Sequence, residues 1–172
     1  MKTNHLFLVI FSFFICSVHS QIVDKKPTES DFNSDTIKNR LERLNTKTPI
    51  ELYFTPSVEK TIKRYLNTRL EFYKKNIDKI SYYLPLFEEQ LQNQKIPAEI
   101  KYLPIIESRL DPSAVSKVGA TGLWQFMFYT ALENGLTMNS YVDERMDPSK
   151  STAAAAIYLN KLYKIHNDWN LV

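Results

Sequence analysis

The sequence predicts a mainly α-helical protein, and three observations support this fold class. Glycine is scarce, with three in 172 residues, and aromatic residues are plentiful, which disfavours turn-rich β architectures. Apolar residues recur at spacings of three and four over residues 58–80, as in an amphipathic helix. Pro97 and Pro148 stand where helices can begin. The length allows one ordinary domain with accessory segments.

The N-terminus has the pattern of a secretory signal peptide. A lysine and an apolar run over residues 6–18 lead to Val18-His19-Ser20, which suits cleavage before Gln21. The run is shorter than the roughly 20 residues that span a bilayer. We therefore predict a signal peptide over residues 1–20 and an exported protein of the periplasm or cell envelope. Cys16 keeps a lipoprotein, and with it an outer-membrane association, open as an alternative.

Removal of residues 1–20 would restrict the available chemistry. The mature chain would contain no cysteine and one histidine, His166. Disulfides, thiol nucleophiles and thiolate metal sites are then excluded, and a histidine-rich metal cluster cannot form. We expect no metal and no cofactor, so hydrolytic or lyase chemistry would depend on carboxyl groups. The net charge of +3 is small and dispersed, so no nucleic-acid partner is expected.

The first half of the mature chain is predicted to be an accessory region. Residues 21–50 are polar and charged, which favours a linker with at most a helical turn or two around Ile37, Leu41 and Leu44. Residues 51–95 are expected to form a helical N-terminal extension.

Within this extension the expected order is an extended segment, a long helix and a second helix. The segment ends at Pro56, and the helix over residues 58–80 takes Ser57 as its N-cap. The second helix carries Pro85 in its first turn, extends to Leu91, and is followed by a break at residues 92–95.

Residues 96–172 are predicted to form the catalytic domain. Pro97 opens a helix that Pro104 kinks or restarts and that Asp111-Pro112 stops. A short helix over residues 130–135 closes at Gly135. After a polar loop over residues 139–146, Asp147 is the predicted N-cap of a helix with Pro148 in its first position. Residues 168–172 look like the beginning of another helix.

Glu107 is the candidate catalytic residue. It follows Leu-Pro-Ile-Ile, so we expect partial desolvation to raise its pKa and keep it protonated near neutral pH. A protonated carboxyl can serve as a general acid. The competing interpretation is a helix-end glutamate bonded to nearby amides, which periodicity alone would favour. Asp111 is expected to stop the helix rather than to act as a partner acid.

The loop after Glu107 contains further candidates, each with two interpretations. Gly119 and Gly122 would allow backbone to approach a ligand, or would simply form turns. Trp124 would serve as a sugar platform, although a core position is the better default. Gln125, among apolar neighbours, needs a hydrogen-bond partner from backbone or ligand.

Three successive motifs are specific when taken together. They are Glu107-Ser108, then Asp111-Pro112-Ser113-Ala114-Val115-Ser116, and then Val118-Gly119-Ala120-Thr121-Gly122-Leu123-Trp124-Gln125-Phe126-Met127. They resemble the lytic transglycosylase (SLT) domain. The flanking Ile96-Pro97-Ala98-Glu99, Leu103-Pro104 and Asp143–Thr152 runs resemble the membrane-bound lytic murein transglycosylase D type. The resemblance spans roughly residues 65–172.

This resemblance implies a lysozyme-like, mainly helical fold with an irregular or short β segment beside a glycan cleft. It implies Glu107 as the single catalytic acid, with substrate-binding residues Ser108, Ser116, Gln125 and Met127. The implied activity cleaves the β-1,4 bond between N-acetylmuramic acid and N-acetylglucosamine and leaves a 1,6-anhydromuramic end, for cell wall remodelling. The implied partners are peptidoglycan glycan strands, with peripheral membrane association left open and no indication of oligomeric state.

Two departures from the family pattern affect these expectations. Phe128-Tyr129 replaces the proline that usually follows Met127. We expect a helix to open at this position, and therefore only a small local change. The Ala-Tyr-Asn motif that should follow residues 168–171 is not reached, so we expect a chain truncated within its catalytic domain. A goose-type lysozyme-like hydrolase and an inactive wall-binding fragment remain the alternatives.

Overall fold

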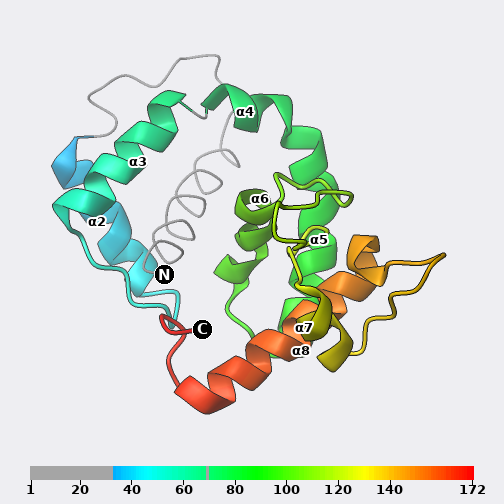
Figure 1. Cartoon of the computed structure of the whole chain (residues 1–172). Helices are drawn as coiled ribbons and strands as arrows, with labels where there is room; N and C mark the ends of the chain where they lie inside the picture. Colours follow the sequence, from blue (N-terminus) through cyan, green and yellow to red (C-terminus); the bar gives the residue numbers. More distant parts are fainter. Residues whose placement is uncertain (1–32, 69) are drawn as a thin grey trace. The chain divides into compact units, whose positions relative to one another are not determined.

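The computed structural model describes residues 33–68 and 70–172, apart from the side chain of Leu70. The chain divides into two compact units, Met1–Ile77 and Asp78–Val172, and each is described by itself. The prediction of a mainly helical protein is confirmed (Figure 1). The predicted signal peptide lies outside the described residues. Over the described ranges, no helix is both long and apolar enough to cross a membrane.

The first unit begins, within the described residues, with helix α2 (Ser34–Asn45). This helix corrects the expectation of at most one or two turns here. Asn33 caps it, accepting a hydrogen bond from the Thr36 amide at 2.8 Å. Ile37 and Leu41, one turn apart, are buried. Burial of this stripe stabilises a helix that composition alone disfavours.

The predicted long helix over residues 58–80 is wrong as a single element. It is divided into α3 (Pro56–Thr68), α4 (Leu70–Lys75) and the start of α5 (Ile77–Asn93). The predicted N-cap is also displaced, because Thr55 rather than Ser57 accepts the amide hydrogen bond of Val58, at 3.2 Å. Pro56 thereby occupies the first helical position, where a missing N–H costs nothing.

The short segment before α3, residues 51–55, has no regular secondary structure. Leu52 is buried. Its amide donates to Oδ1 of Asn45 and its carbonyl accepts from Nδ2 of the same side chain, both at 2.8 Å. One amide side chain thus satisfies both backbone groups of a residue outside regular structure.

In the second unit, helix α5 (Ile77–Asn93) contains Pro85 in its interior. This corrects the prediction that a helix begins at Pro85. Pro85 is exposed, and the helix presents Ile80, Phe87 and Leu91 to the core on its other side. Proline removes one hydrogen bond from a helix. Because Pro85 is on the exposed side, water can satisfy the carbonyl that loses its partner.

The polypeptide next forms η2 (Ala98–Tyr102) and α6 (Leu103–Glu107). Pro104 lies in the first turn of α6, so it restarts the helix rather than kinking it. The loop that follows contains two isolated β-bridges, Val115 with Thr121 and Thr121 with Phe126. Its described residues form no β-strand beyond these bridges.

The remaining elements are α7 (Phe128–Glu133), η3 (Glu144–Met146) and α8 (Pro148–His166). Gly135 follows α7 with a φ of +87°, as expected of its closing residue. Asp147 caps α8 by accepting from the Lys150 amide at 2.8 Å, which confirms that prediction. The helix expected to begin at residue 168 is not formed. Trp169 instead stacks on Tyr163 with ring centroids 4.3 Å apart.

Helix α8 joins the other elements of the second unit (Figure 1). Asn160 Nδ2 donates to the Gln94 carbonyl after α5 at 3.0 Å. Lys161 Nζ donates to Asn134 Oδ1 after α7 at 2.9 Å. Three consecutive alanines, Ala154, Ala155 and Ala156, are buried on it. Small side chains let neighbouring segments pack close to the helix axis, as the alanine run predicted.

Candidate active site

Glu107 is the last residue of α6, and the chain reverses directly after it. The buried Ser108 ends the helix, its hydroxyl donating to the Pro104 carbonyl at 2.9 Å. Arg109 and Leu110 then adopt left-handed backbone conformations, with φ of 56° and 58°. Two consecutive non-glycine residues in this region are uncommon and mark a strained, well-defined turn. Glu107 thus stands at a helix end, and Leu110 in the turn that follows is buried.

The carboxyl of Glu107 differs electrostatically from the other described carboxyl groups. Its pKa is raised above the ordinary value, and desolvation is the cause. The residue as a whole is exposed, so solvent reaches it, but neighbouring apolar atoms remove part of the hydration of its charged form. In the described part of the chain, no hydrogen bond or ion pair reaches this carboxyl. The rise in pKa expected from the sequence is therefore found.

Asp111 shows the opposite behaviour. Its Oδ1 accepts from the Ser113 amide at 2.9 Å and from the Ser113 hydroxyl at 2.7 Å. These hydrogen bonds hold the pKa of Asp111 below its ordinary value. An exposed carboxylate engaged in its own turn is a structural residue, as the sequence predicted, and it is poorly placed to hold a proton for catalysis.

The loop from Ala114 to Phe126 carries two of the predicted substrate-binding residues. Ser116 Oγ accepts from the Ala120 amide at 3.0 Å, and the Ser116 amide donates to the Ala120 carbonyl at 2.8 Å. Gln125, in a left-handed conformation with φ of 50°, donates from Nε2 to the carbonyls of Ala114 and Gly122 at 3.2 and 2.9 Å. The half-buried amide has thus found backbone partners, one of the two options open from the sequence.

The other residues of this loop follow their structural interpretations. Trp124 is a core residue, which was the preferred interpretation from the sequence. Its indole Nε1 donates to Thr152 Oγ1 at 2.9 Å, and its ring packs edge-on against that of Phe87, with ring centroids 5.5 Å apart. At Gly122, with a φ of +82°, a Cβ would lie 1.8 Å from the Arg145 carbonyl oxygen. The close approach that this glycine allows is therefore to the protein's own backbone.

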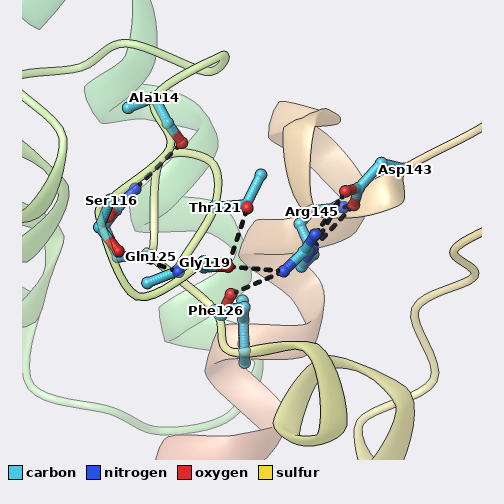
Figure 2. Close-up of polar contacts among 9 residues, drawn as sticks. Ala114, Ser116, Gly119, Thr121, Gln125, Phe126, Asp143 and Arg145 are labelled. Carbon is cyan, nitrogen blue, oxygen red and sulfur yellow. Dashed lines mark hydrogen bonds and ion pairs between the residues drawn. The ribbon is translucent and has the colours of Figure 1, made fainter.

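Arg145 is the residue that sequence reasoning missed (Figure 2). Its Nη2 and Nε donate to the Asp143 carboxylate at 2.6 and 2.9 Å. Its Nη1 donates to the carbonyls of Gly119 and Phe126 at 3.0 and 3.3 Å. A lone arginine in a polar run carries no local signal of such a role, because its partners lie up to 26 residues away.

The predicted site residues fall into two groups. Glu107 and Ser108 stand at the end of α6, whereas Ser116 and Gln125 share the loop, and Met127 follows it with 46% of its surface exposed. Across the described ranges, no hydrogen bond joins Glu107 to Ser116 or Gln125. The same ranges contain no group of three or more His, Cys, Asp or Glu side chains able to hold a metal ion. Glu107 is the one carboxyl among these predicted site residues, and desolvation raises its pKa.

Comparison with known proteins identifies the class. Residues 85–172, just over half of the chain, match the transglycosylase SLT domain. The chain belongs to this family, as the motifs around Glu107 predicted, and the mainly helical fold agrees with the lysozyme-like architecture expected of it.

Individual relatives resemble the same region. An 83-residue stretch is 37% identical to membrane-bound lytic murein transglycosylase D of Escherichia coli strain K12, covering 48% of this chain and 18% of that protein. The values for the protein of Escherichia coli O6:H1 are the same. Over 88 residues the chain is 32% identical to a tributyltin chloride resistance protein of Alteromonas sp. strain M-1, covering 51% of this chain and 42% of that protein. The matched region thus spans less than half the length of each relative.

Proposed function

We propose that this protein is a peptidoglycan lytic transglycosylase that cleaves the β-1,4 bond between N-acetylmuramic acid and N-acetylglucosamine. The observation that carries the proposal is the carboxyl of Glu107, raised in pKa by desolvation and without a polar partner among the described residues. Family membership and the murein transglycosylases among the relatives support the substrate class. No cofactor enters the proposed reaction.

The single acid suits a reaction without net addition of water. Glu107 donates its proton to the glycosidic oxygen as the bond from C1 to that oxygen breaks, and the N-acetylglucosamine side leaves as an alcohol. The C6 hydroxyl of the same muramic residue forms the new bond to C1 and returns its proton to the Glu107 carboxylate. A tethered nucleophile enjoys a high effective concentration, so the second carboxylate that hydrolases commonly use is not required. The product is a 1,6-anhydromuramic end.

The proposed substrate-binding residues would contribute to glycan binding in different ways. Ser116 and Gln125 would bind the glycan through a loop that their own hydrogen bonds shape. Met127 presents an exposed apolar surface to a sugar face. Ser108 is buried against Pro104 and would act by supporting the end of α6 beneath Glu107.

The cellular setting follows from the substrate. Peptidoglycan lies outside the cytoplasmic membrane, and the proposed signal peptide over residues 1–20 would export the protein to the periplasm or cell envelope. There it would remodel the cell wall. The relatives described as membrane-bound support a peripheral membrane association.

Glu107→Gln tests this function directly. Loss of a general acid lowers turnover by roughly 10²–10⁴-fold, and release of soluble fragments from purified peptidoglycan measures it. Asp111→Asn is the matched control, because asparagine keeps an oxygen that can accept the Ser113 bonds and removes only the negative charge. It should retain near-normal turnover.

Mass spectrometry of the products decides the reaction type. Anhydromuramic ends are expected. Reducing ends would instead indicate a goose-type lysozyme-like hydrolase. Binding to peptidoglycan without any fragments, in the wild type and in Glu107→Gln alike, would indicate a wall-binding protein and contradict the proposal.

A further inference from the structure

Arg145 divides its guanidinium between an acidic anchor and the loop. Nε and Nη2 hold the Asp143 carboxylate, while Nη1 reaches two carbonyl oxygens of the loop, those of Gly119 and Phe126 (Figure 2). The side chain is 11% exposed. Charge-assisted, two-pronged hydrogen bonds of a largely buried arginine are among the stronger polar interactions in proteins.

The two carbonyls mark the two functional parts of the loop. Gly119 closes the turn of Ser116, since its amide donates to the Ser116 carbonyl at 3.0 Å. Phe126 follows Gln125 and pairs with Thr121 through amide hydrogen bonds of 3.0 and 3.1 Å in the two directions. One nitrogen of Arg145 therefore fixes the spacing between the segment that carries Ser116 and the segment that carries Gln125.

The backbone of Arg145 restrains the same loop. Its carbonyl oxygen occupies the space where a Cβ of Gly122 would lie, 1.8 Å away. The position of Arg145 is in turn fixed, because Asp143 accepts its amide hydrogen bond at 3.1 Å as the cap of η3. The next residues lead directly into α8, so the restraint on the loop comes from the longest helix of the unit.

We propose that Arg145 is a positioning residue that holds the Ser116–Gln125 loop in its glycan-binding shape, with Asp143 as its anchor. The inference rests on the proposed function and assigns Arg145 no contact with substrate. Within the described residues no hydrogen bond or ion pair joins Arg145 to Glu107, which stands on α6. The interaction therefore governs affinity for the glycan and leaves proton transfer by Glu107 unchanged.

Arg145→Lys is the test variant, since lysine keeps the charge but cannot hold Asp143 and two carbonyls at once. The expected result is a KM for soluble, peptide-free glycan strands raised about tenfold, equivalent to about 1.4 kcal/mol, with kcat and its pH profile nearly unchanged. Asp143→Asn should change KM in the same direction by a smaller factor. Arg43→Lys, at an exposed position of α2, is the matched control.

An activity-independent measurement accompanies the kinetics. Amide hydrogen exchange of Thr121 and Phe126, which pair across the loop, should accelerate in Arg145→Lys while exchange in α8 stays as in the wild type. Unchanged exchange and unchanged KM would overturn the inference. So would a fall in kcat and a rise in KM of equal size that accompany a lower Tm, because they indicate general destabilisation.

The outcomes separate the two proposals. A wild type that releases no glycan fragments defeats the proposed function. In that case, binding of the same glycan strands to Glu107→Gln, with and without Arg145→Lys, and the exchange rates still decide whether Arg145 positions the loop. If the double variant binds as tightly as Glu107→Gln alone, the inference fails.

Discussion

The end of α6 and the loop that follows it use polar groups in opposite ways. Within the described chain, Glu107 keeps a carboxyl without hydrogen-bond partners, and desolvation raises its pKa. In the loop, Ser116, Gln125 and Arg145 each bond to backbone groups. A group that must gain and lose a proton is left without such bonds, whereas the polar side chains of the loop are held in place by theirs.

Of the variants considered, Gly122→Ala is expected to disturb the conformation of the loop most strongly. A methyl group there meets the Arg145 backbone at 1.8 Å, at a φ of +82°, so the loop has to move. We expect a loss of unfolding free energy well beyond the roughly 1–2 kcal/mol that a left-handed alanine costs by itself, and a large loss of activity.

Gly119→Ala is the matched control for that variant. Its φ is +84°, but nothing lies within 4 Å of the added Cβ. It should show the conformational cost alone. Thermal and urea unfolding of both variants measure the difference, and equal destabilisation of the two would show that the contact between Gly122 and Arg145 does not restrain the loop.

The role of Glu107 as the acid can be tested through the pH dependence of activity. Because the raised pKa of Glu107 belongs to the group that must donate a proton, kcat/KM should fall as pH rises through that pKa and not at the lower pKa of an ordinary glutamate. A pH profile on soluble glycan strands locates this limb. A limb at or below the ordinary value of 4.5 would show that Glu107 is not desolvated in the active protein.

The smallest expected effect is on stability. A pKa that is higher in the folded state means that the folded protein binds the proton more tightly than the unfolded chain does. The wild type therefore loses stability as pH rises from the unfolded pKa through the folded one. Glu107→Gln cannot ionise, so it should be slightly more stable than the wild type at pH 7 and equal to it at pH 3. Urea unfolding at both pH values measures this, and a less stable variant at pH 7 would argue against desolvation.

Local signals in the sequence predicted most of the second unit. Asp147 capping α8, Gly135 closing α7 and Trp124 in the core are each determined by neighbouring residues or by side-chain type. Pro104 took one of the two roles left open for it, restarting the helix at α6. Helix α2 was underestimated, because its stability comes from burying Ile37 and Leu41 rather than from composition. Pro85 was misplaced, because a proline is tolerated inside a helix when its side faces solvent.

In the candidate site, too, the features that depend on local sequence were predictable and those that depend on distant contacts were not. Desolvation raises the pKa of Glu107, which is the direction expected from the apolar residues that precede it. Arg145 and the reason for Gly122 depend on contact between segments more than 20 residues apart. Hydrophobic spacing and caps do not specify such contacts, which are set only when η3 packs on the loop.

The place of α8 in the chain also has a consequence for synthesis. Its bonds reach back 28 residues to Trp124 and 66 residues to Gln94. Because α8 is synthesised after α5, α6 and the loop, Trp124 and the Phe87 ring packed against it must wait for the helix that supplies Thr152. Until then they are apolar surface without cover, the condition in which nascent chains recruit chaperones or aggregate. Variants that weaken the packing of α8 should therefore reduce the yield of folded protein more than they reduce the activity of each molecule that folds.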